Sequence, residues 1–148
     1  MFRNTSTGSL MDNAIVRYAG LAGYHQGSPI YVGAIEIRDA SPTISDCRIT
    51  TNALHGIHIL GSSLPTILGC NEISNNAQYG IINEGSNTIS AANNWWGSVT
   101  GPKHATLNPT GTGNKVSDRV TFSPWRTNEC RSETPDMTIR LFLPVAKR

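Results

Sequence analysis

The stretch SPTIS at residues 41–45 returns as LPTIL at residues 64–68 and as NTIS at residues 87–90. The isoleucines of the three copies are Ile44, Ile67 and Ile89, so the interval between copies is nearly constant. Copies at a fixed period are typical of a solenoid, in which each short unit buries its apolar face only against its neighbours. We therefore predict a stack of repeated units, each about 23 residues long.

A second landmark runs alongside the first. The sequence NALHGI at residues 52–57 returns one unit later as NAQYGI at residues 76–81. A fainter copy around residues 11–16 precedes residues 44–49 by a longer interval than the one that separates the other copies. The extra length of this first interval predicts an inserted loop at about residues 20–33.

The units read as short strands. Apolar and polar residues alternate in IEI at residues 35–37 and in IHI at residues 57–59, which is the period of a β-strand. Stacked units pair equivalent strands about 4.8 Å apart, so equivalent side chains form ladders through the stack. The expected ladders are Ile44 with Ile67 and Ile89, Cys47 with Cys70, and Asn52 with Asn76.

The three cysteines cannot all pair within one chain. We expect Cys47 and Cys70 to stack inside as reduced thiols, although neighbouring units also lie close enough for a disulfide. The partner of Cys130 stays open. No C-x-x-C pattern occurs, so the cysteines do not predict a zinc site.

Composition agrees with an all-β solenoid. Charged residues make up 15% of the 148-residue chain, against about 25% in an average soluble domain. Thr, Ser, Asn and Gly are abundant, and these residues favour strand faces and turns over helix interiors. The net charge of +2 argues against charge-driven disorder, and the scattered basic residues of the C-terminal part do not predict nucleic-acid binding. A membrane span is not expected, because no apolar run approaches about 20 residues.

The repeat resembles the right-handed parallel β-helix, or pectin-lyase-like, family. The resemblance covers roughly residues 8–97 and implies about four short coils, so we assign residues 1–97 to the coils. It also implies an extracellular or cell-surface location, although the sequence begins without the apolar stretch of a secretory signal.

The segment after the last unit is similar to the one that follows the last coil in many bacterial surface proteins of this family. It contains NNWWG at residues 93–97, GP at 101–102 and FSPW at 122–125. We expect residues 98–126 to form a capping loop, with Trp95 and Trp125 covering the apolar end of the stack. The alternative is that the tryptophans, including Trp96, stack on sugar rings. Residues 127–148 form a tail with a possible edge strand at residues 137–144.

The family resemblance implies acidic polysaccharides as ligands, with calcium held by clustered acidic residues and an Arg or Lys base. The outward ladder Glu36, His58 and Ile82 does not match that pattern. Glu72 and Glu84 look isolated, and His55 and His58 should point to opposite faces of one strand. We assign no catalytic residue, metal ligand or cofactor, and take Glu36, His58 and Trp96 as the candidate ligand surface.

The sequence thus favours a non-catalytic structural or binding module that contacts a polysaccharide or a protein. Two alternatives remain. The first alternative is that the chain is a fragment or relative of a polysaccharide lyase or hydrolase. The second is that it is a module that self-associates through an uncapped N-terminal coil, where a second copy would dock.

Overall fold

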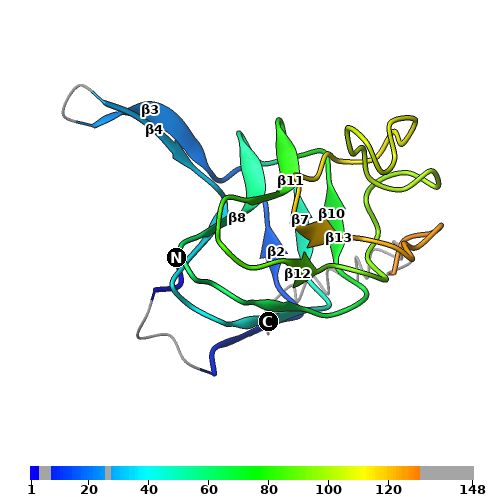
Figure 1. The fold of residues 1–148 in the computed structure, drawn as a ribbon, viewed down its shortest axis with the longest axis horizontal. Coiled ribbons are helices and arrows are strands. Elements are labelled where there is room, and N and C mark those ends of the chain that lie inside the picture. Colours follow the sequence, from blue (N-terminus) through cyan, green and yellow to red (C-terminus); the bar gives the residue numbers. More distant parts are fainter. Residues whose placement is uncertain (4–7, 26–27, 131–148) are drawn as a thin grey trace, which may run out of the picture.

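The computed structural model describes residues 1–3, 8–25 and 28–130, and every regular element in these ranges is a strand (Figure 1). The chain winds through three sheets of parallel strands, as the repeat predicted. Each sheet takes one strand from successive coils. Sheet A contains β5 (Ile35–Arg38), β8 (His55–Leu60) and β11 (Tyr79–Asn83).

The other two sheets begin one coil earlier. Sheet B contains β1 (Leu10–Asp12), β6 (Thr43–Ser45) and β9 (Thr66–Ile67) in that order. Sheet C contains β2 (Ile15–Val16), β7 (Arg48–Thr50) and β10 (Glu72–Ser74). Met11 pairs with Ile44, and Val16 pairs with Ile49, so the register of the faint first copy is confirmed.

The insertion expected at about residues 20–33 is an antiparallel hairpin of β3 (Leu21–His25) and β4 (Ser28–Val32). It projects away from the coils in Figure 1. Because the hairpin leaves the coil after β2 and returns to it before β5, it lengthens the first coil without disturbing the sheets.

Isoleucine fills the interior between the sheets. Ile57 pairs with Ile35 on one side and with Ile81 on the other, and Ile44 pairs with Ile67. The side chains of these ladders are almost completely buried and belong to one core cluster. Its isoleucines are Ile35, Ile37, Ile44, Ile49, Ile57, Ile59, Ile67, Ile73, Ile81 and Ile89.

The ladder expected from Cys47 and Cys70 is wrong. Arg48 pairs with Glu72, which aligns Cys47 with Asn71, and the Cys47 N–H donates to Asn71 Oδ1 at 2.9 Å. The cause is one additional residue between Ile67 and Ile73, compared with the interval between Ile44 and Ile49. Cys70 instead lies at a corner with φ of 69° and forms a disulfide with Cys130.

A polar ladder occupies another corner. Asn52 Nδ2 donates to Asn76 Oδ1 at 2.7 Å, and Asn76 Nδ2 donates to Asn114 Oδ1 at 2.8 Å. Asn71 and Asn94 join neighbouring coils at a second corner, where the backbone N–H of Asn71 donates to Asn94 Oδ1 at 2.7 Å. Asparagine side chains can satisfy backbone groups at corners that no strand pairing reaches.

The segment after the third coil packs on that coil. β12 (Ile89–Ser90) pairs in parallel with β13 (Val120–Thr121), and Val116 bridges to Ile81. Trp96 is fully buried in the core, and Trp125 packs against the core from its edge. The Trp96 ring is therefore not an exposed platform on which a sugar ring could stack. The possible strand at residues 137–144 lies outside the described residues.

Candidate functional site

The outer face of sheet A carries the polar ladder that the sequence singled out. Glu36 pairs with His58, and His58 pairs with Ile82, so the three residues lie side by side on neighbouring coils. Glu36 and His58 are each only 6% exposed, so they do not form the solvent-facing surface that we expected. Glu36 Oε1 lies 3.6 Å from Arg38 Nε.

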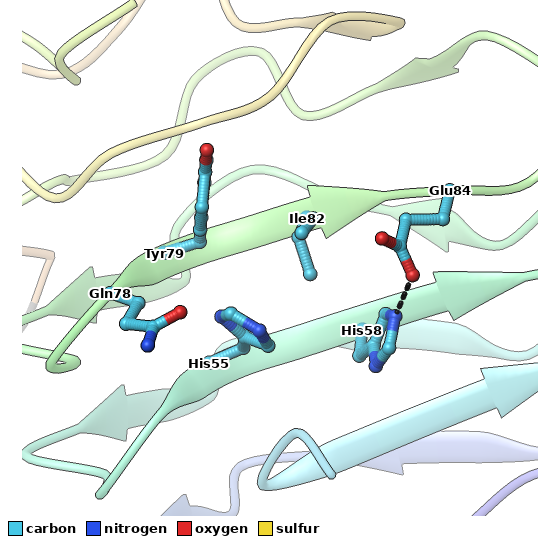
Figure 2. Close-up of a pocket in the computed structure, with 6 residues that line it drawn as sticks. All are labelled: His55, His58, Gln78, Tyr79, Ile82 and Glu84. Atoms are coloured by element: carbon cyan, nitrogen blue, oxygen red, sulfur yellow. Dashed lines mark hydrogen bonds and ion pairs between the residues drawn. The ribbon is translucent and has the colours of Figure 1, made fainter. Parts of the chain in front are cut away.

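His58 has an acidic partner that sequence inspection missed. Glu84 follows β11, and its side chain reaches back to His58 on β8 (Figure 2), where Oε2 lies 2.7 Å from His58 Nε2. The two residues are 26 positions apart in sequence but one coil apart in space. Glu84 is therefore not isolated, and neither is Glu72, whose Oε2 accepts from Arg48 Nε at 2.7 Å.

His55 and His58 lie on the same side of the coil, contrary to the expectation from strand alternation. Their ring centres are 5.6 Å apart in an edge-to-face arrangement, and His55 makes a similar contact with Tyr79. His55 is the first residue of β8, directly after a corner. Strict alternation applies only within a regular strand, so it does not fix the direction of this side chain.

These residues surround an open hollow of about 510 Å³ between β8 and β11. Tyr79 and Gln78 form one end, Glu84 forms the other, and Ile82 is the apolar part of the lining (Figure 2). Lys115 Nζ lies 4.5 Å from the centre of the Tyr79 ring, within the range of a cation–π contact.

Burial controls the charge of His55, which is only 4% exposed. Desolvation lowers the pKa of His55, the neighbouring His58 lowers this pKa further, and Glu84 partly opposes the shift. The neutral form of His55 is therefore favoured. Its Nδ1 and the Nδ1 of His58 are both buried without a hydrogen-bond partner.

The arrangement of strands agrees with a comparison of the whole sequence. The model of the right-handed beta helix region matches residues 1–97. The chain belongs to the right-handed β-helix family. No curated protein and no solved structure matched it.

Within this β-helix, the hollow between β8 and β11 is the place where titratable side chains gather. Its members come from two coils, so their sequence separation hides their proximity. The repeat itself held the signal: His55 and Tyr79 occupy equivalent positions in NALHGI and NAQYGI, one repeat unit apart. The same register pairs His58 with Ile82, and Glu84 lies two residues further along the neighbouring coil.

Two further observations apply to the described part of the β-helix. There, no three side chains of His, Cys, Asp or Glu are placed to hold a metal ion together. Residues 1–3, 8–25 and 28–130 also contain no helix with the length and hydropathy needed to cross a bilayer.

Proposed function

We propose that this β-helix is a non-catalytic module that binds a saccharide chain in the hollow between β8 and β11. The observation that carries the proposal is the collection of hydrogen-bonding groups in one open depression: the Gln78 amide, the Tyr79 hydroxyl, His55 and the Glu84 carboxylate. Small-molecule sites combine an apolar surface with a few placed polar groups, and Ile82 and the Tyr79 ring supply that surface.

The surroundings support an extended ligand. A second hollow of about 290 Å³ shares Gln78 with the first and is lined by Lys103, Lys115 and Asn114. A chain of sugars that occupied both hollows would run across the coils and meet amide and ammonium donors along its length. A saccharide chain repeats its hydroxyl groups along its length, and the coils repeat polar side chains at the spacing of the strands.

A location outside the reducing cytosol fits this role. Disulfides persist in secreted and cell-surface proteins and are rare in the cytosol. The Cys70–Cys130 disulfide therefore supports the extracellular placement that the family resemblance implied.

The experiment is a binding screen of the full chain against a panel of polysaccharides, followed by calorimetric titration of the hits. We expect Tyr79→Ala and Gln78→Ala to weaken binding at least tenfold. Tyr18→Ala is the matched control, because Tyr18 is an exposed tyrosine that also has a cationic neighbour. Arg17 Cζ lies 5.5 Å from the centre of its ring, and Lys115 Nζ lies in a similar position over Tyr79. Equal losses in Tyr79→Ala and Tyr18→Ala, or no ligand in the panel, would overturn the proposal.

Polysaccharide cleavage is the second candidate, favoured by one observation. His55 lines an open hollow, and desolvation lowers its pKa, which favours the neutral ring that a general base requires. Incubating the chain with the same panel and measuring unsaturated products and reducing ends tests this candidate. Turnover that disappears in His55→Gln would replace the binding proposal with an enzymatic one.

Self-association at the first coil is the third candidate. β1 and β2 are the outer strands of sheets B and C, and Leu10, Ile15 and Tyr18 are 64%, 58% and 75% exposed there. Apolar edge strands pair readily with other chains. Sedimentation at rising concentration should then show a dimer that Leu10→Lys dissociates, whereas a strict monomer would exclude it.

A further inference from the structure

Two buried imidazoles in the hollow each keep a nitrogen without a partner. His55 is 4% exposed and His58 is 6% exposed, and Nδ1 of both rings lacks a hydrogen bond. Buried polar atoms are almost always paired, so two orphans on adjacent rings need an explanation. We propose that His55 and His58 bind one divalent transition-metal ion, of the Zn²⁺ or Cu²⁺ class, with Glu84 orienting His58 from behind.

Glu84 prepares His58 for this role. When its carboxylate accepts the Nε2–H of a neutral His58, the other ring nitrogen, Nδ1, carries the lone pair. Histidines that bind metals usually donate their second ring N–H to a carboxylate or carbonyl, which fixes the tautomer and the ring orientation. The 2.7 Å contact between His58 Nε2 and Glu84 Oε2 is this arrangement.

The distance between the rings suits a shared ion. The ring centres of His55 and His58 are 5.6 Å apart. Two imidazoles on one tetrahedral ion have centres about 5 Å apart, given metal–nitrogen distances of about 2.0–2.1 Å. The χ2 torsion of histidine is soft, so His55 can turn a nitrogen toward the ion without moving the strand.

His104 is a buried histidine of the same protein that serves as a comparison. Its Nε2 also lies near a carboxylate, Asp118 Oδ1, at 3.3 Å. Its Nδ1, however, accepts the backbone N–H of Leu107 at 3.1 Å. Both nitrogens of His104 are thus occupied, whereas Nδ1 of His58 is available to a ligand.

The chemistry of the donors selects the metal. Imidazole nitrogen suits zinc, copper and nickel, while calcium needs six or more oxygen ligands. Since no third His, Cys, Asp or Glu of the described residues completes the set, two positions on the ion would face the open hollow. Water or an oxygen of a bound molecule would fill them, so the site resembles an open centre more than a closed structural one.

The test is a titration of the untagged full chain with Zn²⁺ by calorimetry and with Cu²⁺ by electron paramagnetic resonance, without saccharide. We expect one ion per chain and a spectrum with nitrogen hyperfine coupling. His55→Gln and His58→Gln should each lose at least tenfold in affinity, and Glu84→Gln should lose about 10–100-fold, as outer partners of metal ligands do.

Two variants control for other histidines. Asp118→Asn removes the carboxylate of the equivalent His104 pair and should leave affinity unchanged, as should His25→Gln. Circular dichroism checks that each variant is folded. The proposal is overturned if the wild type binds no ion at one equivalent, if His55→Gln binds as tightly as the wild type, or if His25→Gln abolishes binding. Because no saccharide is present, failure here leaves the saccharide proposal standing.

Discussion

Asn52 donates its side-chain N–H to Oδ1 of Asn76 at 2.7 Å, so two successive coils are joined by a side-chain hydrogen bond that no strand pairing provides. Asn76 continues the ladder, because its own Nδ2 donates to Asn114 Oδ1 at 2.8 Å and also lies 3.0 Å from Ile49 O. Each of these side chains therefore replaces backbone partners at a buried corner.

Asn76→Ala should destabilise the fold by about 1–3 kcal/mol, because it leaves buried groups of Asn52 and Ile49 without partners. Denaturant unfolding monitored by circular dichroism measures this loss. Asn87→Ala is the control: its Nδ2 also donates to a backbone oxygen, that of Ser62 at 2.9 Å, but in an exposed loop. A loss in Asn87→Ala as large as in Asn76→Ala would contradict the role of the buried ladder.

Ile57 lies at the centre of an isoleucine ladder, fully buried between Ile35 and Ile81. Ile57→Ala should cost about 2–5 kcal/mol, since the rigid coils on either side cannot collapse into the space. Leu64→Ala removes a side chain that is 53% exposed and should change stability by no more than about 0.5 kcal/mol. Similar unfolding midpoints for the two variants would contradict the ladder as the main apolar support.

The isoleucine ladders were predictable because their period survives in the sequence. Ile44 and Ile67 mark the same strand position in successive coils, and only that position must stay apolar. The cysteine ladder failed for a local reason: a single additional residue at the corner before β10 moved Cys70 one place off the register. Short strands tolerate such changes at corners, so the spacing between coils is a poor guide there.

The candidate site was predicted only in part. The pairing of Glu36 with His58 and Ile82 followed from the repeat. The contact of Glu84 with His58 and the shared direction of His55 did not, because His55 is the first residue of β8 and Glu84 lies just beyond the end of β11, where alternation no longer fixes side-chain direction. The burial of Glu36 and His58 was not predicted either, because it depends on neighbouring segments of the chain. The alternation of residues within one strand carries no information about those segments.

Asp39 should make stability depend on acid pH. It sits at a corner with φ of 51°, and the backbone N–H and the hydroxyl of Ser62 both donate to its Oδ1. These hydrogen bonds, the backbone one first, lower the pKa of Asp39 below its ordinary value of 3.8. The charged form is thus favoured in the folded state, so its contribution is complete above pH 3.8 and disappears as the pH falls through the lowered folded value.

Asp39→Asn removes the charge and keeps an acceptor oxygen at a position that tolerates positive φ. It should be less stable than the wild type at pH 7, and the difference should shrink as the pH falls below 3.8. Thermal unfolding at a series of pH values measures this. A difference that stays constant throughout the acid range would show that the hydrogen bonds do not depend on the charge.

The Cys70–Cys130 disulfide should stabilise the folded chain by constraining the unfolded one. It closes a loop between residues 60 positions apart, which contains β10, β11, β12 and β13. The chain-entropy model gives a stabilisation of about 4 kcal/mol for a loop of this size. Cys130→Ser, or addition of dithiothreitol, should lower the denaturation midpoint accordingly.

Cys47 provides the matched control for this prediction, since it is buried in the core and its thiol donates to Ser45 O at 3.0 Å. Cys47→Ala should be less stable than the wild type in both conditions, because it removes core volume. It should nevertheless lose the same further amount on reduction. The prediction is contradicted if dithiothreitol leaves the midpoint of the wild type unchanged, or if the midpoint of Cys47→Ala no longer responds to it. Either result would show that the bond between Cys70 and Cys130 does not stabilise the folded chain.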